Sequence, residues 1–273
     1  MFDWTSKTDR CEPLIKWPGG KRALLPQLLP LLPSSFNRYI EPFFGGGALF
    51  FSVQPHFALL SDSNEDLINC YREIRDNPDQ LLSSLRRMKN SKEDYYRIRS
   101  MAPRTSSGRA ARFLYLTTLA FNGIYRVNRH GEFNVPYGYK THLCVYQPEK
   151  IMRISQVLAK CDLECIDFEE ALKRARPGDL IYLDPPYTVA HGQNGFRKYN
   201  AKIFSWGDQD RLARALHVLD KKGCYIIMSN ASHSSINNLY RGFTRLTVER
   251  PSVIAASADY RCRVSESLIT NLV

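Results

Sequence analysis

The residues best suited to chemistry follow an apolar run in the second half of the chain. Leu180–Leu183 is continuous hydrophobic sequence, and Asp184, Pro185, Pro186 and Tyr187 come directly after it. Such a run is typical of a buried parallel strand, and ligands of open α/β sheets bind where these strands end. The prolines stop the strand and stiffen the backbone, because each fixes φ and lacks an N–H donor. A carboxylate, free carbonyls and a ring suit a planar substrate with an exocyclic amine, such as adenine; Asp-Pro-Pro can equally end a strand in a simple turn.

A glycine-rich turn is the second candidate site. Residues 39–48 (Tyr-Ile-Glu-Pro-Phe-Phe-Gly-Gly-Gly-Ala) predict a strand, a turn containing Phe43, Gly45 and Gly47, and the start of a helix. Glycines let the backbone bend sharply and let a ligand approach closely. Asp62 ends the next apolar run, where nucleotide-binding folds hold ribose hydroxyls. No Gly-x-x-x-x-Gly-Lys-Ser/Thr pattern is present, which favours an adenosine-type ligand without a triphosphate over ATP.

The third candidate site is the sequence Ile-Lys-Trp-Pro-Gly-Gly-Lys at residues 15–21. Trp before Pro-Gly-Gly can simply be a capped hydrophobic turn. Alternatively, this loop covers a cofactor, with Trp17 packing on it and Lys21 pairing with a carboxylate. Pro26 and Pro30 in the following stretch permit only a short or kinked helix.

The elements that must position these residues follow an α/β pattern. Apolar runs predict strands at Arg38–Glu41, His56–Asp62, Leu163–Phe168, Leu180–Asp184, Cys224–Asn230, Thr244–Arg250 and Ser265–Asn271. Helical patterns between them cover Phe168–Ala175, Asp208–Lys222 and Ser232–Tyr240, with Asp208 as the expected N-cap. This alternation predicts a doubly wound, mostly parallel sheet.

The middle of the chain has a different pattern, and it carries the charge. Helices are predicted at Asp66–Arg75, Pro78–Met88, Lys92–Met101 and Gly108–Asn122, followed by a β-hairpin at Tyr125–Val135 that turns at Asn128–Gly131. We therefore divide the chain into an α/β domain (residues 1–65 and 148–273) and a helical insertion (residues 66–147). Of the formal net charge of +11, residues 86–140 contribute twelve Lys or Arg against three Asp or Glu. Charge runs are usually solvated faces, but this concentration favours a polyanion such as nucleic acid.

Length and composition exclude several classes of protein. The 273 residues contain no stretch long enough to span a membrane, and the N-terminus lacks a basic-then-apolar signal pattern. Seven scattered cysteines form no Cys-x-x-Cys pair; Cys161 and Cys165, without a histidine cluster, favour buried thiols over a metal site. We expect a cytoplasmic, metal-free protein that is a monomer in solution.

Together the motifs resemble Dam-type DNA N6-adenine methyltransferases. Trp-x-Gly-Gly-Lys, Glu-Pro-Phe-x-Gly-Gly-Gly, Asp62, Phe-Asn-Val-Pro-Tyr-Gly and Asp-Pro-Pro-Tyr occur in the order of that family, in which cofactor motifs precede a target-recognition insertion and Asp-Pro-Pro-Tyr follows it. The resemblance runs from about residue 14 to residue 273. It implies a Rossmann-like methyltransferase domain that uses S-adenosylmethionine and acts on double-stranded DNA.

The resemblance also implies roles for single residues. S-adenosylmethionine contacts fall on Trp17, Lys21, Asp62 and Asp184, with the Phe43–Gly47 turn around the methionine end and Asp167-Phe168 facing the cofactor's adenine. The target amine donates to Asp184 and to the Pro185 carbonyl, and Tyr187 stacks on the extruded base. Two acceptors favour a pyramidal nitrogen and offset its developing charge. An adenine inside a duplex cannot be reached, so it must be flipped out.

The DNA-reading element matches the segment from Phe121 through Pro136. The implied contacts are Phe121, Asn122, Ile124, Arg126, Asn128, Arg129 and Pro136. Arg126 is expected to bind guanine O6 and N7, or alternatively a phosphate, and Ile124 and Pro136 suit a thymine methyl. The hairpin most resembles those of enzymes that methylate GATC. Two departures are Phe121, where near relatives often have Tyr, and residues 252–258, which lack a common Asn-Gly pair.

Two other functions remain open on the sequence. The same acceptors suit an RNA base or a protein amide, and a degenerate cofactor site would leave a non-catalytic DNA-binding protein. The hairpin and the net charge of +9 on residues 86–140 favour duplex DNA over an RNA base or a protein amide. Intact Trp17, Lys21, Asp62 and Asp184 argue against the second.

Overall fold

The central feature of the computed structural model is one mixed sheet. The structure describes residues 10–188, 204–251 and 263–272, so the predicted loop at 252–258 lies outside the described residues. The strands are β1 (Tyr39–Glu41), β2 (Ala58–Ser61), β3 (Cys161–Glu164), β4 (Leu180–Leu183), β5 (Tyr225–Ala231), β6 (Thr244–Pro251) and β7 (Arg263–Thr270). Their order is β3-β2-β1-β4-β5-β7-β6; the first five are parallel, and β7 runs antiparallel between β5 and β6. This confirms the predicted doubly wound, mostly parallel sheet.

Helices cover both faces of this sheet. The α-helices are α1 (Leu25–Leu28), α2 (Ala48–Val53), α3 (Glu65–Asp76), α4 (Pro78–Leu85), α5 (Lys92–Ser100), α6 (Ser106–Leu119), α7 (Pro148–Leu158), α8 (Phe168–Lys173), α10 (Trp206–Lys221) and α11 (Ser234–Leu239). Short 3₁₀ helices occur at η1 (Arg22–Leu24), η2 (Leu29–Leu31) and η3 (Phe121–Gly123). Pro26 and Pro30 lie at the starts of α1 and η2, which confirms the predicted short or kinked helix.

Alternate side chains of the strands pack in two hydrophobic cores, one on each face of the sheet. Ile40, Leu59 and Ile181 join a core with helices α8, α10 and α11, whereas Tyr39 and Leu60 join the core of the opposite face. Successive residues of a strand point to opposite faces, and both faces are covered, so the parallel strands are continuous apolar runs.

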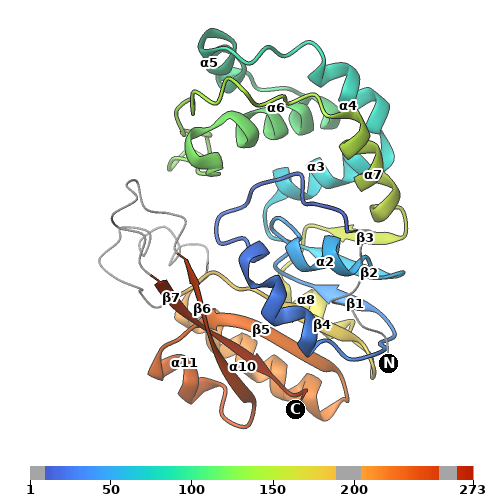
Figure 1. Ribbon diagram of the computed structural model, residues 1–273, viewed down its shortest axis with the longest axis vertical. Coiled ribbons are helices and arrows are strands. Elements are labelled where there is room, and N and C mark those ends of the chain that lie inside the picture. Colours follow the sequence, from blue (N-terminus) through green and yellow to red (C-terminus); the bar gives the residue numbers. More distant parts are fainter. Residues whose placement is uncertain (1–9, 189–203, 252–262, 273) are drawn as a thin grey trace.

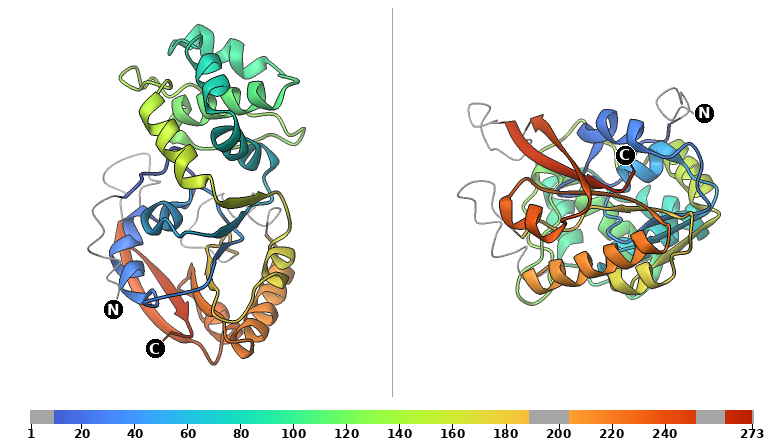
Figure 2. Two further views of the ribbon diagram at one scale, coloured as in Figure 1. Left: turned by 90° about the vertical axis from the view of Figure 1, so that its right-hand side faces the viewer. Right: turned by 90° about the horizontal axis from the view of Figure 1, so that it is seen from below.

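The helical insertion stands at one end of the molecule. Figures 1 and 2 show α4, α5 and α6 gathered beyond α3 and α7, on the side of the sheet where β3 forms the edge. Leu81, Tyr95 and Phe113 belong to the same core as Tyr39 and Leu60, so the core of the insertion is continuous with the core on one face of the sheet. Its cations lie outside this core: Arg86, Arg87, Lys89, Lys92, Arg97 and Arg104 are exposed.

Three local predictions need correction. Asp208 is not the N-cap of α10: Ser205 is, and Asp208 closes a capping box by accepting from the Ser205 N–H at 2.8 Å. This is the Ser-x-x-acid arrangement that satisfies two orphan donors at once. The predicted strand at 163–168 ends at Glu164, because Asp167 begins α8 as its N-cap. The predicted helix through Asn122 ends at Leu119, and α7 was not predicted at all.

The predicted hairpin is present only as a minimal pairing. Val127 and Phe133 form one isolated antiparallel bridge, and the Asn128 N–H donates to the Glu132 carbonyl at 2.8 Å. The turn lies where it was predicted, with Gly131 at φ +78°. Regular strands do not form in residues 125–135, since the bridge is one residue long.

Candidate active site

The sheet reverses its strand order between β1 and β4. From β1 the chain continues to β2 on one side, and from β4 it continues to β5 on the other. Segments that leave two such strands diverge, and ligands of doubly wound sheets bind at this point. The Phe43–Gly47 turn follows β1 and Asp184–Tyr187 follows β4. The fold therefore brings the two predicted sites together at the carboxyl ends of the neighbouring strands β1 and β4.

The glycine turn requires its glycines. Gly45 and Gly47 have φ of +48° and +64°, a left-handed conformation that is costly for other residues. A Cβ on Gly45 would lie 2.6 Å from the Trp17 ring, and one on Gly47 would lie 2.5 Å from the Phe44 ring. Gly47 then serves as the N-cap of α2.

Asp62 is tied to this turn. Its Oδ2 accepts from the Gly45 N–H at 3.0 Å, and its Oδ1 accepts from the Asn64 N–H at 2.9 Å. Burial raises the pKa of Asp62, and the two backbone donors oppose that shift. The neighbouring Ser61 hydroxyl is buried and has no hydrogen-bond partner among the described residues.

Lys21 and Asp184 form the central contact of the site. Lys21 is 4% exposed; its Nζ lies 2.8 Å from Asp184 Oδ1 and donates to the Gly19 carbonyl at 2.9 Å. Burial raises the pKa of Asp184, while the Lys21 ammonium and a hydrogen bond from Ser229 lower it. The predicted pairing of Lys21 with a carboxylate is thus confirmed, and the carboxylate is Asp184.

Ser229 is a site residue that sequence reasoning missed. Its hydroxyl donates to Asp184 Oδ1 at 2.8 Å from the neighbouring strand β5. The signal was a pair of polar residues, Ser229-Asn230, at the end of an apolar run. Both contacts of Asp184 to described side chains fall on Oδ1, so Oδ2 is the oxygen left for a substrate donor.

Tyr187, the last residue of the Asp-Pro-Pro-Tyr segment, contacts the same ammonium. The Tyr187 ring is partly exposed, and Lys21 Nζ lies 4.8 Å from its centroid. Pro185 is buried and Pro186 half-buried. The Asp184 carboxylate and the Tyr187 ring are therefore neighbours of the Lys21 ammonium, which comes from a separate part of the chain.

Trp17 links the glycine turn to the helical insertion. Its ring stacks on Tyr125 at a centroid distance of 5.2 Å and lies 6.2 Å from Phe113. It also limits the space at Gly45. Tyr125 is a second residue that the sequence did not single out, and Trp17 joins it to the site.

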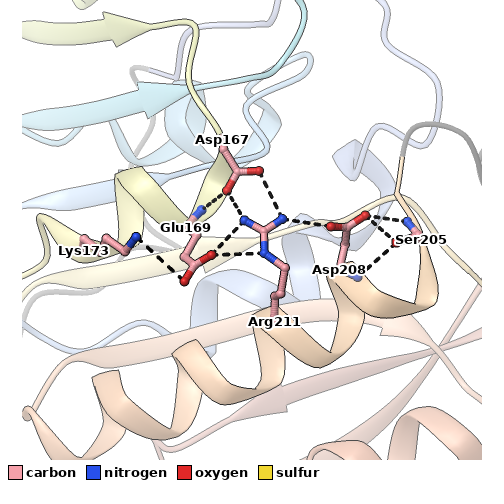
Figure 3. A network of polar contacts seen from close by, with 6 residues as sticks. All are labelled: Asp167, Glu169, Lys173, Ser205, Asp208 and Arg211. Atoms are coloured by element: carbon pink, nitrogen blue, oxygen red, sulfur yellow. Dashed lines mark hydrogen bonds and ion pairs between the residues drawn. The ribbon is translucent and has the colours of Figure 1, made fainter.

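Asp167 and Phe168 lie to the side of this centre, at the start of α8. Figure 3 shows Arg211 of α10 between Asp167, Glu169 and Asp208; its Nη2 donates to Asp167 Oδ1 at 2.7 Å and to Glu169 Oε2 at 2.8 Å. Phe168 is buried and stacks on Phe43 at 5.4 Å. The Phe43 side chain thus packs in the core beneath the turn.

The predicted DNA contacts lie together on the surface of the insertion. Arg126 is exposed, and its Nε donates to Asn134 Oδ1 at 2.8 Å. Phe121 is 50% exposed, and Asn122 beside it has φ +54°. The remaining members vary in exposure: Arg129 and Pro136 are exposed, and Ile124 and Asn128 are partly exposed. The Asn128 side chain accepts from the His130 and Glu132 N–H groups, so it holds the turn.

Comparisons with known proteins identify the family of the chain. Residues 17–254 match the family described as D12 class N6 adenine-specific DNA methyltransferase. The chain is 39% identical to a type II methyltransferase of Lactococcus lactis subsp. cremoris over 95% of each chain. It is 33% identical to a DNA adenine methylase of Haemophilus influenzae, covering 93% of this chain and 91% of that one.

Fold and site define an α/β methyltransferase with an inserted helical unit. The chain belongs to the D12 class N6 adenine-specific DNA methyltransferase family. Its described residues include no group of three or more His, Cys, Asp or Glu side chains placed to hold a metal ion. Among the described helices, none combines the length and apolar content needed to cross a membrane.

Gly47→Ala tests the glycine turn. The variant combines left-handed strain with a clash against the buried Phe44 ring, so the free energy of unfolding should fall by about 3 kcal/mol. Gly131→Ala is the matched control, because Gly131 has φ +78° and nothing within 4 Å of an added Cβ. Urea unfolding measures both; equal losses would show that the clash contributes nothing.

Proposed function

We propose that this protein transfers a methyl group from S-adenosylmethionine to N6 of an adenine flipped out of duplex DNA, within GATC. The observation that carries the proposal is the Asp184 carboxylate, fixed by Lys21 and Ser229 at the point where the sheet order reverses. Family membership supports the substrate and the reaction, and the roles of single residues are our inference from the geometry.

The residues at the glycine turn fit the cofactor. The three glycines at residues 45–47, the Asp62 carboxylate and the buried Ser61 hydroxyl form an acceptor-rich cradle without a phosphate-binding lysine motif. These acceptors suit the two ribose hydroxyls of an adenosine that carries no triphosphate. Trp17, Lys21, Asp62 and the Phe43–Gly47 turn would hold it, with Asp167 and Phe168 toward its adenine. When bound, S-adenosylmethionine supplies an electrophilic sulfonium methyl group.

Asp184 prepares the target amine for attack. An adenine amine is a poor nucleophile because its lone pair is delocalised into the ring. Asp184 Oδ2 and the Pro185 carbonyl can accept hydrogen bonds from the two N–H groups of the adenine amine. These bonds localise the nitrogen lone pair and stabilise the positive charge that the nitrogen gains. Lys21 and Ser229 hold the carboxylate through Oδ1, so the acceptor is positioned before the base arrives.

Two aromatic side chains suit a flipped base. Tyr187 is partly exposed beside Asp184, and base–aromatic stacking contributes about 1–3 kcal/mol per base. Phe121 is exposed on the DNA-reading segment, where it is suited to fill the space that the base leaves. The exposure of both residues supports the proposal of base flipping.

The target sequence is proposed from the DNA-reading segment. Because Asn134 engages only the Nε of Arg126, both terminal nitrogens remain for guanine O6 and N7. Ile124 and Pro136 offer apolar contact to a thymine methyl group. These contacts and the resemblance to GATC enzymes support GATC.

Asp184→Asn tests the catalytic proposal. Asparagine keeps the shape of the side chain but removes the negative charge and one acceptor, so methyl transfer should slow by about 10²–10³. Incorporation of radiolabelled methyl into a GATC duplex measures the rate, and fluorescence anisotropy measures duplex affinity, which should change little. Asp162→Asn, at an exposed position on β3, is the control. Full activity of Asp184→Asn would refute the mechanism.

Arg126→Ala tests direct readout. Loss of a bidentate contact should reduce discrimination at one base pair by about 1–3 kcal/mol. Competition binding with all single substitutions of GATC measures it. Arg129→Ala, which removes another exposed arginine of the segment 121–136, should weaken every duplex alike. A uniform loss with Arg126→Ala would make Arg126 a phosphate contact.

A further inference from the structure

Glu266 is a buried carboxylate to which the mechanism above gives no role. It lies on β7, opposite Ala231 of β5 and Val248 of β6, and it is fully buried. Its Oε2 lies 3.8 Å from Lys21 Nζ. A charge at such a position is costly unless it is paired, so its environment has to compensate for it.

Lys21 lies between two carboxylates that come from different strands. Its Nζ is hydrogen-bonded to Asp184 Oδ1 at 2.8 Å, and Glu266 Oε2 approaches it at 3.8 Å. The second distance is too long for a hydrogen bond but is a close ion contact. The Tyr187 ring lies 4.8 Å from the same nitrogen, which also donates to the Gly19 carbonyl at 2.9 Å.

These three charges, Lys21, Asp184 and Glu266, form what we call the charge cluster. Lys21 and Asp184 alone would be a neutral pair, and an ammonium on Oδ1 draws electron density from the carboxylate. Glu266 gives the cluster a net charge of −1 at full ionisation. In a water-poor site this charge is only weakly screened, so it favours the positive charge that grows on the target amine.

We infer that Glu266 is a positioning residue for methyl transfer, which acts through Lys21 to keep Asp184 oriented and the charge cluster negative. The inference rests on the proposed function, because it assigns a role within the same site. Asp184 touches the target amine, whereas Glu266 does not.

The dependence of the methyl-transfer rate on pH distinguishes this role from a structural one, through the loss of rate at low pH (the acid limb). Asp184 faces Lys21, Ser229 and Glu266, with Tyr187 and Tyr182 on its own segment and Glu41 on β1. Burial raises the pKa of Asp184, Lys21 and Ser229 lower it, and Glu266 raises it. Removing the charge of Glu266 therefore lowers this pKa. Protonated Asp184 is a poor acceptor, so the rate, which is lost as pH falls through the pKa, should be lost at a lower pH in the variant.

Glu266→Gln is the test, with single-turnover methyl transfer to a GATC duplex at saturating S-adenosylmethionine. The maximal rate should fall about tenfold, since misplacement of a reacting group by a fraction of an ångström is enough for this. KM values for cofactor and duplex should stay close to those of the wild type. Glu170→Gln, at an exposed position on α8, removes the same charge elsewhere and should change neither the rate nor the acid limb.

Two results would overturn the inference. One is a Gln variant with the wild-type rate and acid limb; the other is a lowered melting temperature with normal kinetics per folded molecule, which would make Glu266 structural. If Glu266→Gln does not fold, Glu266→Asp is the second test, because it moves the charge back by one methylene group. A slower rate is expected, with a shift of the acid limb smaller than that expected for Glu266→Gln. Wild-type behaviour of this variant would refute the inference. An inactive wild type would instead reject the proposed function.

Discussion

A buried ammonium holds the ends of separate chain segments together. Lys21 enters from the loop before η1, Asp184 from the end of β4, and Ser229 from β5 bonds the same carboxylate oxygen. Taking two charges out of water costs several kcal/mol per ion, which only close pairing and further hydrogen bonds offset. The Gly19 carbonyl provides such a bond at 2.9 Å, and φ of +80° at Gly19 explains the glycine there. The loop and the strand ends therefore fix one another.

The same loop connects the site to the DNA-reading segment. Trp17 packs between the glycine turn and Tyr125, which directly precedes Arg126. Gly123 supports this arrangement, because a Cβ there would lie 2.8 Å from the Lys16 side chain. The loop that we propose holds the cofactor and the segment that we propose reads the duplex are therefore in contact through Trp17 and Tyr125.

Sequence patterns predicted most of what depends on short-range order. Apolar runs located the parallel strands, because buried strands are apolar on both faces, and strand ends located Asp62 and Asp184. The predicted N-cap of α10 was wrong because Ser205 and Asp208 both suit that role. Which of the two is the N-cap depends on where the helical backbone begins. The hairpin was overestimated because a turn signal does not determine how many residues pair beyond it.

Long-range contacts were beyond sequence reasoning for a physical reason. Ser229, Arg211 and Glu266 act on partners about 45 or more residues away along the chain, so no spacing rule connects them. Glu266 even interrupts the apolar pattern of β7, which by itself suggests an exposed position. Only the order of the sheet and the burial of its strands reveal such residues.

We propose that the fixed carboxylate of Asp184, at the end of β4, directs methyl transfer to the amine of adenine in duplex DNA. The most direct measurement is sequencing of genomic DNA from a host without methylation of its own, after expression of this protein, with detection of modified bases. The account predicts N6-methyladenine at GATC and at no other sequence. Unmodified DNA, or methyl groups only on RNA or on another base, would contradict it.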